Sequence, residues 1–284
     1  MPSYKIITDY PQKSEVYLDI VRKFRALLSG MAMVKNDGKT ALVQTTASGE
    51  AVFCKRFRHG GIINSIKNQF RCSKAKMSYL AAKESSKRGI PVPEHLAAIE
   101  KHIAGFLINS YVIMRAVQDA LPLRRYINSK FPLSGHYCAT EKLRFINEFA
   151  AFLAKVHSTG MIHNDLKATN ILVNEKDNNH AFYILDLDNV TFKKSMPMKI
   201  IVRNLVQLNN DCMYFSGGLD RLRFFLEYLK QAGLQMSRSD KHTLARKIEN
   251  LTLKKVKRWQ NEVKKLEHRG KLKHHDDTIL LDKK

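Results

Sequence analysis

Short segments with alternating polar and apolar residues dominate the first part of the chain. The stretches "TALVQTT" (residues 40–46) and "EAVFCKRF" (residues 50–57) are rich in β-branched and aromatic residues, and "ASGE" between them predicts a hairpin. A helix is expected from residue 73 to 87, where Gly89 and the prolines of "GIPVP" end it. The stretches "HLAAIEK" and "GFLINSYVIMRAV" predict a second pair of strands.

The pattern changes to helix from about Leu121 onward. "EKLRFINEFAAFLAKVHSTG" (residues 141–160) carries apolar residues at steps of three and four, and Gly160 is placed to stop the helix. Two short apolar runs, "ILV" and "FYIL", predict buried strands, and the helical pattern returns beyond residue 199. The expected fold class is therefore α+β, with a small antiparallel-sheet lobe joined to a larger helical lobe and a ligand site at the seam.

These patterns predict four parts of the chain. They are an N-terminal extension (1–30), a sheet-rich lobe (31–114), a helical lobe (115–270) and a tail (271–284). The N-terminus lacks a basic start followed by an apolar core, and no apolar run approaches the roughly 18 residues of a membrane span. We therefore expect a cytoplasmic protein.

The composition predicts the sign of the partner's charge. The chain has 284 residues, 44% of them hydrophobic, and 49 Lys and Arg face 26 Asp and Glu, for a net charge of +23. Such a surface attracts polyanions, and an anionic membrane surface or RNA would suit it equally. Four widely spaced cysteines predict free thiols in a reducing compartment.

One loop concentrates the polar groups that suggest chemistry. "MIHNDLKATNILVNE" (residues 161–175) matches the pattern H-x-D-L-K-x-x-N of the protein-kinase catalytic loop through His163, Asp165, Lys167 and Asn170. Asp186 follows the next short strand, where that motif set places a metal-binding carboxylate. A polar turn whose side chains only cap the backbone is the alternative, but a cap requires neither the lysine nor the distant aspartate.

Phosphoryl transfer explains why these residue types occur together. Asp165 would orient the acceptor hydroxyl and take its proton, and Lys167 would neutralise charge on the γ-phosphate of ATP. Asn170 and Asp186 offer the oxygen atoms that Mg²⁺ prefers. His163 is expected to brace the loop.

The remaining candidates concern nucleotide binding. Lys55 in "AVFCKRF" matches the V-A-I-K strand and would contact the α- and β-phosphates. Glu84 is the only acidic residue between Lys55 and Glu94 and is the candidate ion-pair partner of Lys55, although an exposed surface glutamate is the alternative. Gly38 and Lys39 would cover the phosphates, and Met114 marks the expected crossover between the lobes.

Three features depart from the protein-kinase pattern. "VKNDGKTALV" has one glycine in place of G-x-G-x-x-G, "DLD" stands where D-F-G is expected, and no A-P-E follows. Asp188 therefore occupies the position of the flexible glycine. The activation segment of regulated protein kinases is not expected.

The chain resembles the lipopolysaccharide kinases of the Kdo/WaaP group, particularly its InaA-like branch. The resemblance rests on "KNDGKT", "VFCKRF", "GIPVPEHLAAIE", "HNDLKATNILV", "YILDLDNV", "RNLVQLN" and "DRLRFFLEYL", in that order. It implies a protein-kinase-like fold, ATP with Mg²⁺, and phosphorylation of a Kdo or heptose hydroxyl of the lipopolysaccharide core at the cytoplasmic face of the inner membrane. The implied partner is an anionic glycolipid, and no nucleic acid is expected.

Two other functions remain open from the sequence. An enzyme of the same fold could use a protein Ser/Thr or another small-molecule acceptor, although Lys167 argues against the aminoglycoside type. A non-enzymatic kinase-like module that binds nucleotide or lipid is the third interpretation. Such a module has no chemical reason to keep Lys55, Asp165, Asn170 and Asp186 together.

Overall fold

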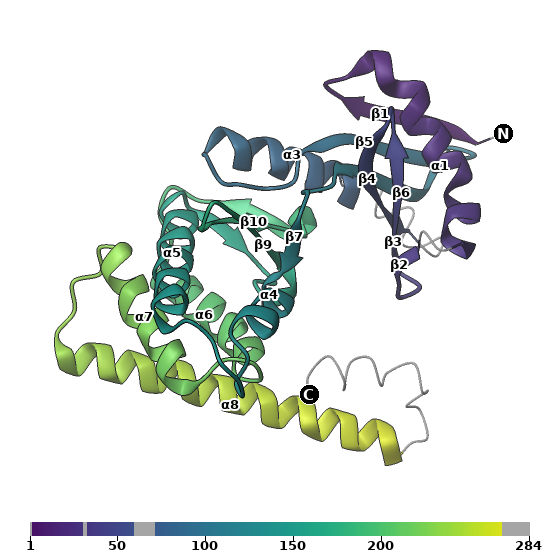
Figure 1. Ribbon diagram of the computed structural model, residues 1–284. Coiled ribbons are helices and arrows are strands. Elements are labelled where there is room, and N and C mark those ends of the chain that lie inside the picture. The colour runs from purple at the N-terminus through teal and green to yellow at the C-terminus, as the bar shows by residue number, and fades with distance from the viewer. Residues whose placement is uncertain (1, 31–32, 60–71, 269–284) are drawn as a thin grey trace. The chain divides into compact units, whose positions relative to one another are not determined.

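The computed structural model describes residues 2–30, 33–59 and 72–268 (Figure 1). The chain divides into two compact units, one of residues 1–119 and 183–191 and the other of residues 120–182 and 192–284. The expected tail at 271–284 lies outside the described residues. No helix in the described residues combines the length and the apolar character that a membrane span requires.

The first unit is built on a six-stranded antiparallel sheet in the order β1-β5-β6-β4-β3-β2. Its elements are β1 (Ser3–Thr8), η1 (Pro11–Lys13), α1 (Ser14–Ser29), β2 (Met33–Asn36), β3 (Thr40–Ala47), β4 (Glu50–Arg58), α3 (Lys74–Lys87), β5 (His95–Ile103), β6 (Phe106–Arg115) and the 3₁₀ turn η3 (Leu187–Asn189). The predicted hairpin is confirmed as β3 and β4, with Leu42 opposite Lys55. The predicted helix and second strand pair are confirmed as α3, β5 and β6.

The N-terminal segment is part of this unit's core. Strand β1 pairs with β5, and α1 packs its buried face, which includes Tyr17 and Phe24, onto the sheet. The loop between them ties the segment to α3, because Asp9 accepts a hydrogen bond from Tyr79 (2.9 Å) and forms an ion pair with Lys83. Residues 3–29 thus complete the sheet and brace α3.

The second unit is mainly helical. Its elements are β7 (Ala120–Pro122), α4 (Leu123–Lys130), α5 (Ala139–Ser158), β8 (Met161–His163), η2 (Ala168–Asn170), β9 (Ile171–Lys176), β10 (Asn179–Ile184), β11 (Val190–Phe192), α6 (Met198–Cys212), α7 (Gly218–Gln231) and α8 (Arg238–His268), where β10 and β11 each extend across the boundary between the units. Helices α5 and α7 pack together, and α8 packs on α6. Aromatic rings fill the space around α5: Tyr126, Phe131, Phe145, Phe149, Phe182 and Phe224.

Gly160 fixes where α5 ends and the strand to the catalytic loop begins. The residue has φ +76°, which favours glycine, and a Cβ atom there would lie 1.8 Å from the carbonyl oxygen of Lys193. The Gly160 carbonyl also accepts the backbone N–H of Lys193 at 2.9 Å. Glycine is therefore required both by the backbone conformation and by the close approach of the chain, and the predicted helix stop is confirmed.

Candidate active site

The catalytic-loop residues lie together in the second unit, from His163 at the end of β8 to Asn170 at the end of η2. Lys167 Nζ lies 2.8 Å from a carboxylate oxygen of Asp165, and both side chains are partly exposed. The side-chain nitrogen of Asn170 donates to the carbonyl of Asp165 at 2.9 Å, which leaves its amide oxygen as the atom suited to a metal. His163 is buried, and its Nδ1 accepts the backbone N–H of Asp165 at 3.1 Å, so this ring braces the loop as expected.

Helix α6 holds the same loop from outside, a role that the sequence reasoning missed. Asn204 donates to the His163 carbonyl (2.7 Å), and Gln207 donates to the Asn164 carbonyl (2.7 Å) and accepts from the N–H of Leu166 (3.3 Å). Two further α6 side chains bond the loop: Arg203 to the Asn164 side chain and Asp211 to the Ala168 N–H.

These side chains share one face of α6, because residues three and four apart on a helix are neighbours. The polar residues at steps of three and four in "RNLVQLNND" (residues 203–211) are the signal that points to them. Helix α6 therefore fixes the backbone that carries Asp165 and Lys167.

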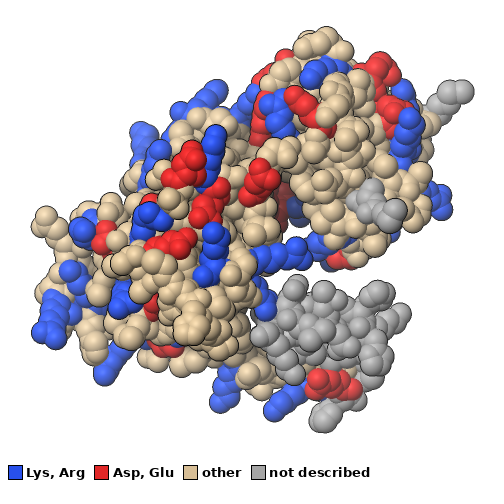
Figure 2. Space-filling model, in the orientation of Figure 1, with Lys and Arg blue, Asp and Glu red and all other residues tan. Residues whose placement is uncertain are grey.

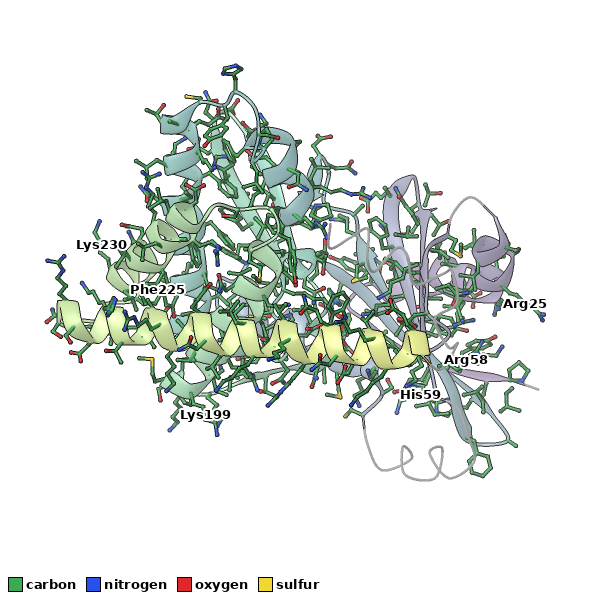
Figure 3. All side chains as sticks on the ribbon, turned by 90° about the horizontal axis from the view of Figure 1, so that it is seen from below. Arg25, Arg58, His59, Lys199, Phe225 and Lys230 are labelled. Carbon is green, nitrogen blue, oxygen red and sulfur yellow. The ribbon has the colours of Figure 1, made fainter. Side chains whose placement is uncertain are left out.

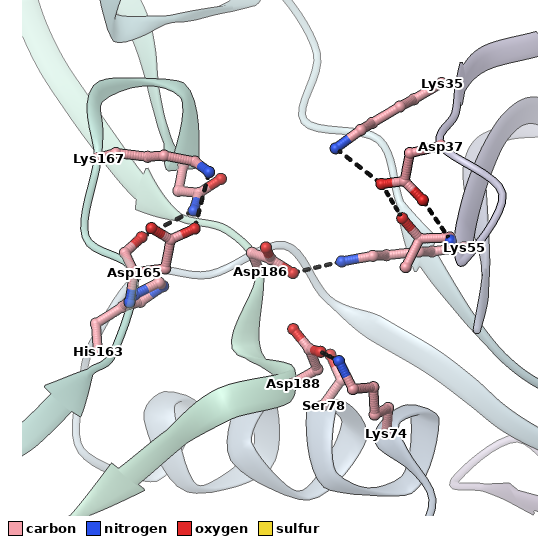
Figure 4. Close-up of polar contacts among 12 residues, drawn as sticks. Lys35, Asp37, Lys55, Lys74, Ser78, His163, Asp165, Lys167, Asp186 and Asp188 are labelled. Atoms are coloured by element: carbon pink, nitrogen blue, oxygen red, sulfur yellow. Dashed lines mark hydrogen bonds and ion pairs between the residues drawn. The ribbon is translucent and has the colours of Figure 1, made fainter. Parts of the chain in front are cut away.

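The other predicted residues lie in the first unit, where two of them, Lys55 and Asp186, form a four-charge cluster with Lys74 and Asp188 (Figure 4). Lys55 on β4 forms an ion pair with Asp186, and Lys74 Nζ lies 3.0 Å from Asp188. The Phe57 ring lies beneath both ammonium groups, 4.9 Å from Lys55 Nζ and 5.7 Å from Lys74 Nζ. Burial raises the pKa of the Asp188 carboxyl, and its hydrogen bond with Asp186 acts in the same direction.

Asp186 has a left-handed backbone, with φ 61° and ψ 57°. A non-glycine residue rarely adopts this conformation, although Asp and Asn tolerate it best. Such outliers persist where surrounding contacts hold them, and they concentrate at functional sites. The 3₁₀ turn that follows is anchored by Leu187, which is buried.

The predicted ion pair between Lys55 and Glu84 is wrong. Glu84 lies in the last turn of α3 and forms an ion pair with Arg88 four residues later, with Nε–O 2.6 Å. Lys55 is engaged by Asp186 instead. The spacing of four residues between Glu84 and Arg88 is the signal in the sequence for this pair, because residues four apart on a helix are neighbours.

The expected phosphate-covering loop is a tight turn between β2 and β3. The Asp37 carboxylate accepts the N–H groups of Lys39 (3.1 Å) and Thr40 (2.6 Å), and Gly38 has φ +80°. Partial burial by itself would raise the pKa of Asp37. The hydrogen bonds from Thr40 and the charge of Lys35 outweigh burial and lower this pKa below its ordinary value. Met114 lies near the end of β6, opposite Phe53 of β4.

Comparison with known proteins defines the class. A solved structure described as "WaaP in complex with acyl carrier protein" matches with a TM-score of 0.61 and 16% identity, over 87% of this chain and 99% of that one. "Probable serine/threonine-protein kinase PknB" of Lactococcus lactis subsp. lactis (strain IL1403) is 35% identical over 71 residues, which are 25% of this chain and 10% of that kinase. The fold is thus a protein-kinase-like, two-lobe α+β fold.

The family follows from a broader match. The model of the lipopolysaccharide kinase (Kdo/WaaP) family matches residues 34–248. This span covers well over half of the chain, and the chain belongs to that family. Kinases of this family are phosphotransferases that act on sugar hydroxyl groups, and a kinase family implies the use of ATP.

Proposed function

We propose that this lipopolysaccharide kinase transfers the γ-phosphate of ATP to a Kdo or heptose hydroxyl of the inner core. The observation that carries the proposal is the catalytic loop, in which Asp165 and Lys167 lie side by side on a backbone that α6 holds through several hydrogen bonds. A carboxylate beside a cation suits a hydroxyl acceptor that loses its proton next to a negatively charged phosphate. The family supplies the substrate class.

Each predicted residue has a proposed role in this reaction. Asp165 orients the acceptor hydroxyl and takes its proton, Lys167 offsets charge on the γ-phosphate, and Lys55 contacts the α- and β-phosphates. Proposed contacts of Gly38, Lys39 and Met114 with the nucleotide complete the set. For Gly38 and Lys39 this requires phosphate oxygens to compete with the Asn36 side chain for the Gly38 N–H and with Asp37 for the Lys39 N–H.

The donor atoms fit Mg²⁺. Asp186 offers a carboxylate, and Asn170 offers an amide oxygen because its nitrogen is used by the Asp165 carbonyl. Both are hard oxygen donors, which Mg²⁺ prefers to nitrogen or sulfur. When bound, the ion would offset negative charge on the phosphates. Asp186 and Asn170 are the residues proposed to hold it.

Mass spectrometry of the lipid A–core fraction tests the acceptor. Cells that express the protein should yield core molecules one phosphate heavier than cells that lack it, and fragmentation should place that phosphate on Kdo or on heptose. A phosphate found on lipid A itself, or an unchanged core, would contradict the proposal. An Asp165→Asn strain is the matched control, because the protein is present without the proposed proton acceptor.

We also propose that the enzyme works at the anionic, cytoplasmic face of the inner membrane. Lys and Arg side chains are spread over the visible surface, and α8 continues as one unbroken helix (Figures 2 and 3). Its last part carries exposed basic residues around the partly buried Val256, Trp259 and Val263, a pattern of interfacial helices. Sedimentation with anionic vesicles, weakened by added salt, would support this location.

A cavity in the second unit supports the proposal of a second ligand-binding site. It measures about 400 Å³ and lies among α4, α5, α6, α7 and α8, lined mainly by apolar side chains such as Phe149, Leu205 and Phe225. The ion pair between Lys142 and Asp220 (2.6 Å) is among the lining groups. The structural neighbour is described in complex with acyl carrier protein. We propose that this cavity receives the acyl chain of such a carrier.

Native mass spectrometry with an acylated carrier protein tests this property. We expect a complex with the acylated carrier and at least tenfold weaker binding of the carrier without its acyl group, because burying each methylene contributes about 0.8 kcal/mol. Ala245→Trp, which fills the cavity from its lining, should weaken the complex while thermal unfolding shows a folded protein. Equal binding of both carrier forms would contradict the proposal.

A further inference from the structure

Helix α3 begins with a lysine, which helix stability alone does not favour. Ser73 caps the helix by accepting the N–H of Lys76 at 3.1 Å, and the first turn holds no acidic residue. A cation near a helix N-terminus opposes the helix dipole. The ammonium of Lys74 instead lies 3.0 Å from Asp188, whose side chain is only 11% exposed. The contact therefore accounts for the lysine better than the helix does.

The start of α3 is also packed against the strand that carries Lys55. Ala75 is fully buried and belongs to the same apolar cluster as Phe57 of β4. The Phe57 ring lies within cation–π distance of both lysines. The buried Ala75 thus anchors the backbone at the start of α3, while the Lys74 side chain itself is 57% exposed, so a change at Lys74 alters one charge on a fixed frame.

The partner of Lys74 belongs to the turn that presents Asp186. Asp188 is the middle residue of η3, and this turn packs against α3. The preceding residue, Leu187, is buried, and Asp186 has the left-handed backbone. A contact that holds Asp188 therefore helps to hold a rare backbone conformation two residues before it.

We propose that Lys74 and Asp188 are positioning residues that keep the Asp186 carboxylate in place for the reaction. In protein kinases the corresponding helix provides a glutamate that pairs with the strand lysine. Here Lys55 pairs with Asp186 itself, and Glu84, the only acidic residue of α3, pairs with Arg88. The helix therefore contacts the turn that carries Asp186 through the positive charge of Lys74, where protein kinases use a negative charge. The inference rests on the proposed role of Asp186.

A double-mutant cycle tests whether the two residues act through each other. Lys74→Met and Asp188→Asn should each lower kcat about tenfold, roughly the effect of losing one charge-assisted hydrogen bond, and the double variant should be no worse than either single one. Lys74→Arg should keep most of the activity. Lys83→Met is the matched control, because it breaks the ion pair of α3 with Asp9 at the other end of the same helix and should leave kcat within about twofold.

Hydrogen exchange of the protein without nucleotide gives a readout independent of activity. The amides of residues 187–190 should exchange faster in Lys74→Met and in Asp188→Asn, and at the wild-type rate in Lys83→Met. Multiplying losses in the double variant, with a raised Mg²⁺ requirement for Asp188→Asn alone, would show that Asp188 acts on the metal and overturn the proposal. Unchanged exchange of these amides in Lys74→Met would also overturn the proposal. This readout does not depend on which acceptor the enzyme uses.

Discussion

Asp186→Asn is expected to lower the turnover number on the order of a thousandfold or more. The substitution removes a negative charge from the proposed metal ligand and the ion-pair partner of Lys55, and metal-assisted charge stabilisation contributes several kcal/mol to such reactions. Asparagine is chosen because it tolerates the left-handed conformation of residue 186 about as well as aspartate does. The fold should therefore be retained.

The control for this variant is Asp177→Asn. Asp177 also has a positive φ (51°), but it lies in the exposed turn between β9 and β10. Turnover and thermal unfolding of this control should match the wild type. Near-normal turnover in Asp186→Asn, measured at saturating ATP and Mg²⁺, would remove Asp186 from the proposed metal site.

Asp165→Asn should lower kcat by about 10²- to 10⁴-fold, the range typical of losing a general base. The affinity for ATP should stay within about threefold, because the proposed contact of Asp165 is with the acceptor hydroxyl. The α6 hydrogen bonds reach the loop backbone and the Asn164 side chain, so they do not depend on the Asp165 carboxylate. Thermal unfolding should change little.

Lys55→Met provides the contrast. Its ammonium is proposed to contact the α- and β-phosphates, so calorimetry should show weaker ATP binding as well as slower turnover. The same variant also removes the ion pair between Lys55 and Asp186. Equal and large losses of ATP affinity in Asp165→Asn and Lys55→Met would contradict the separate roles of the two residues.

Local sequence patterns were enough to predict most of the regular elements. The alternation around Lys55 predicts β4, and the capping signals around residues 73–89 predict α3, since both depend on neighbours in the sequence. The N-terminal elements were not predicted, although Tyr17, Leu18, Val21 and Phe24 follow helical spacing. Strand β1 becomes recognisable only through its pairing with β5, about 95 residues away.

The candidate site also has one part that the sequence predicts and one part that it does not. The spacing of Asp165, Lys167 and Asn170 is local, and the sequence therefore identifies them as one loop. The contacts that hold the site join distant segments: Lys74 with Asp188, and α6 with the loop about 40 residues before it. Residue spacing carries no information on such pairings. Glu84 differs, because its partner Arg88 lies only four residues later, and this local spacing supports the alternative of a surface glutamate over a pair with Lys55.

The most direct test of the account is phosphate transfer by the purified protein from γ-labelled ATP and Mg²⁺. Core oligosaccharide bearing Kdo and heptose, a generic protein substrate and RNA would be offered in parallel, with Asp165→Asn as the inactive reference. The account predicts label in the core oligosaccharide, at a rate at least a hundredfold above the reference. Label that appears only in the protein substrate, or in no acceptor at all, would contradict it.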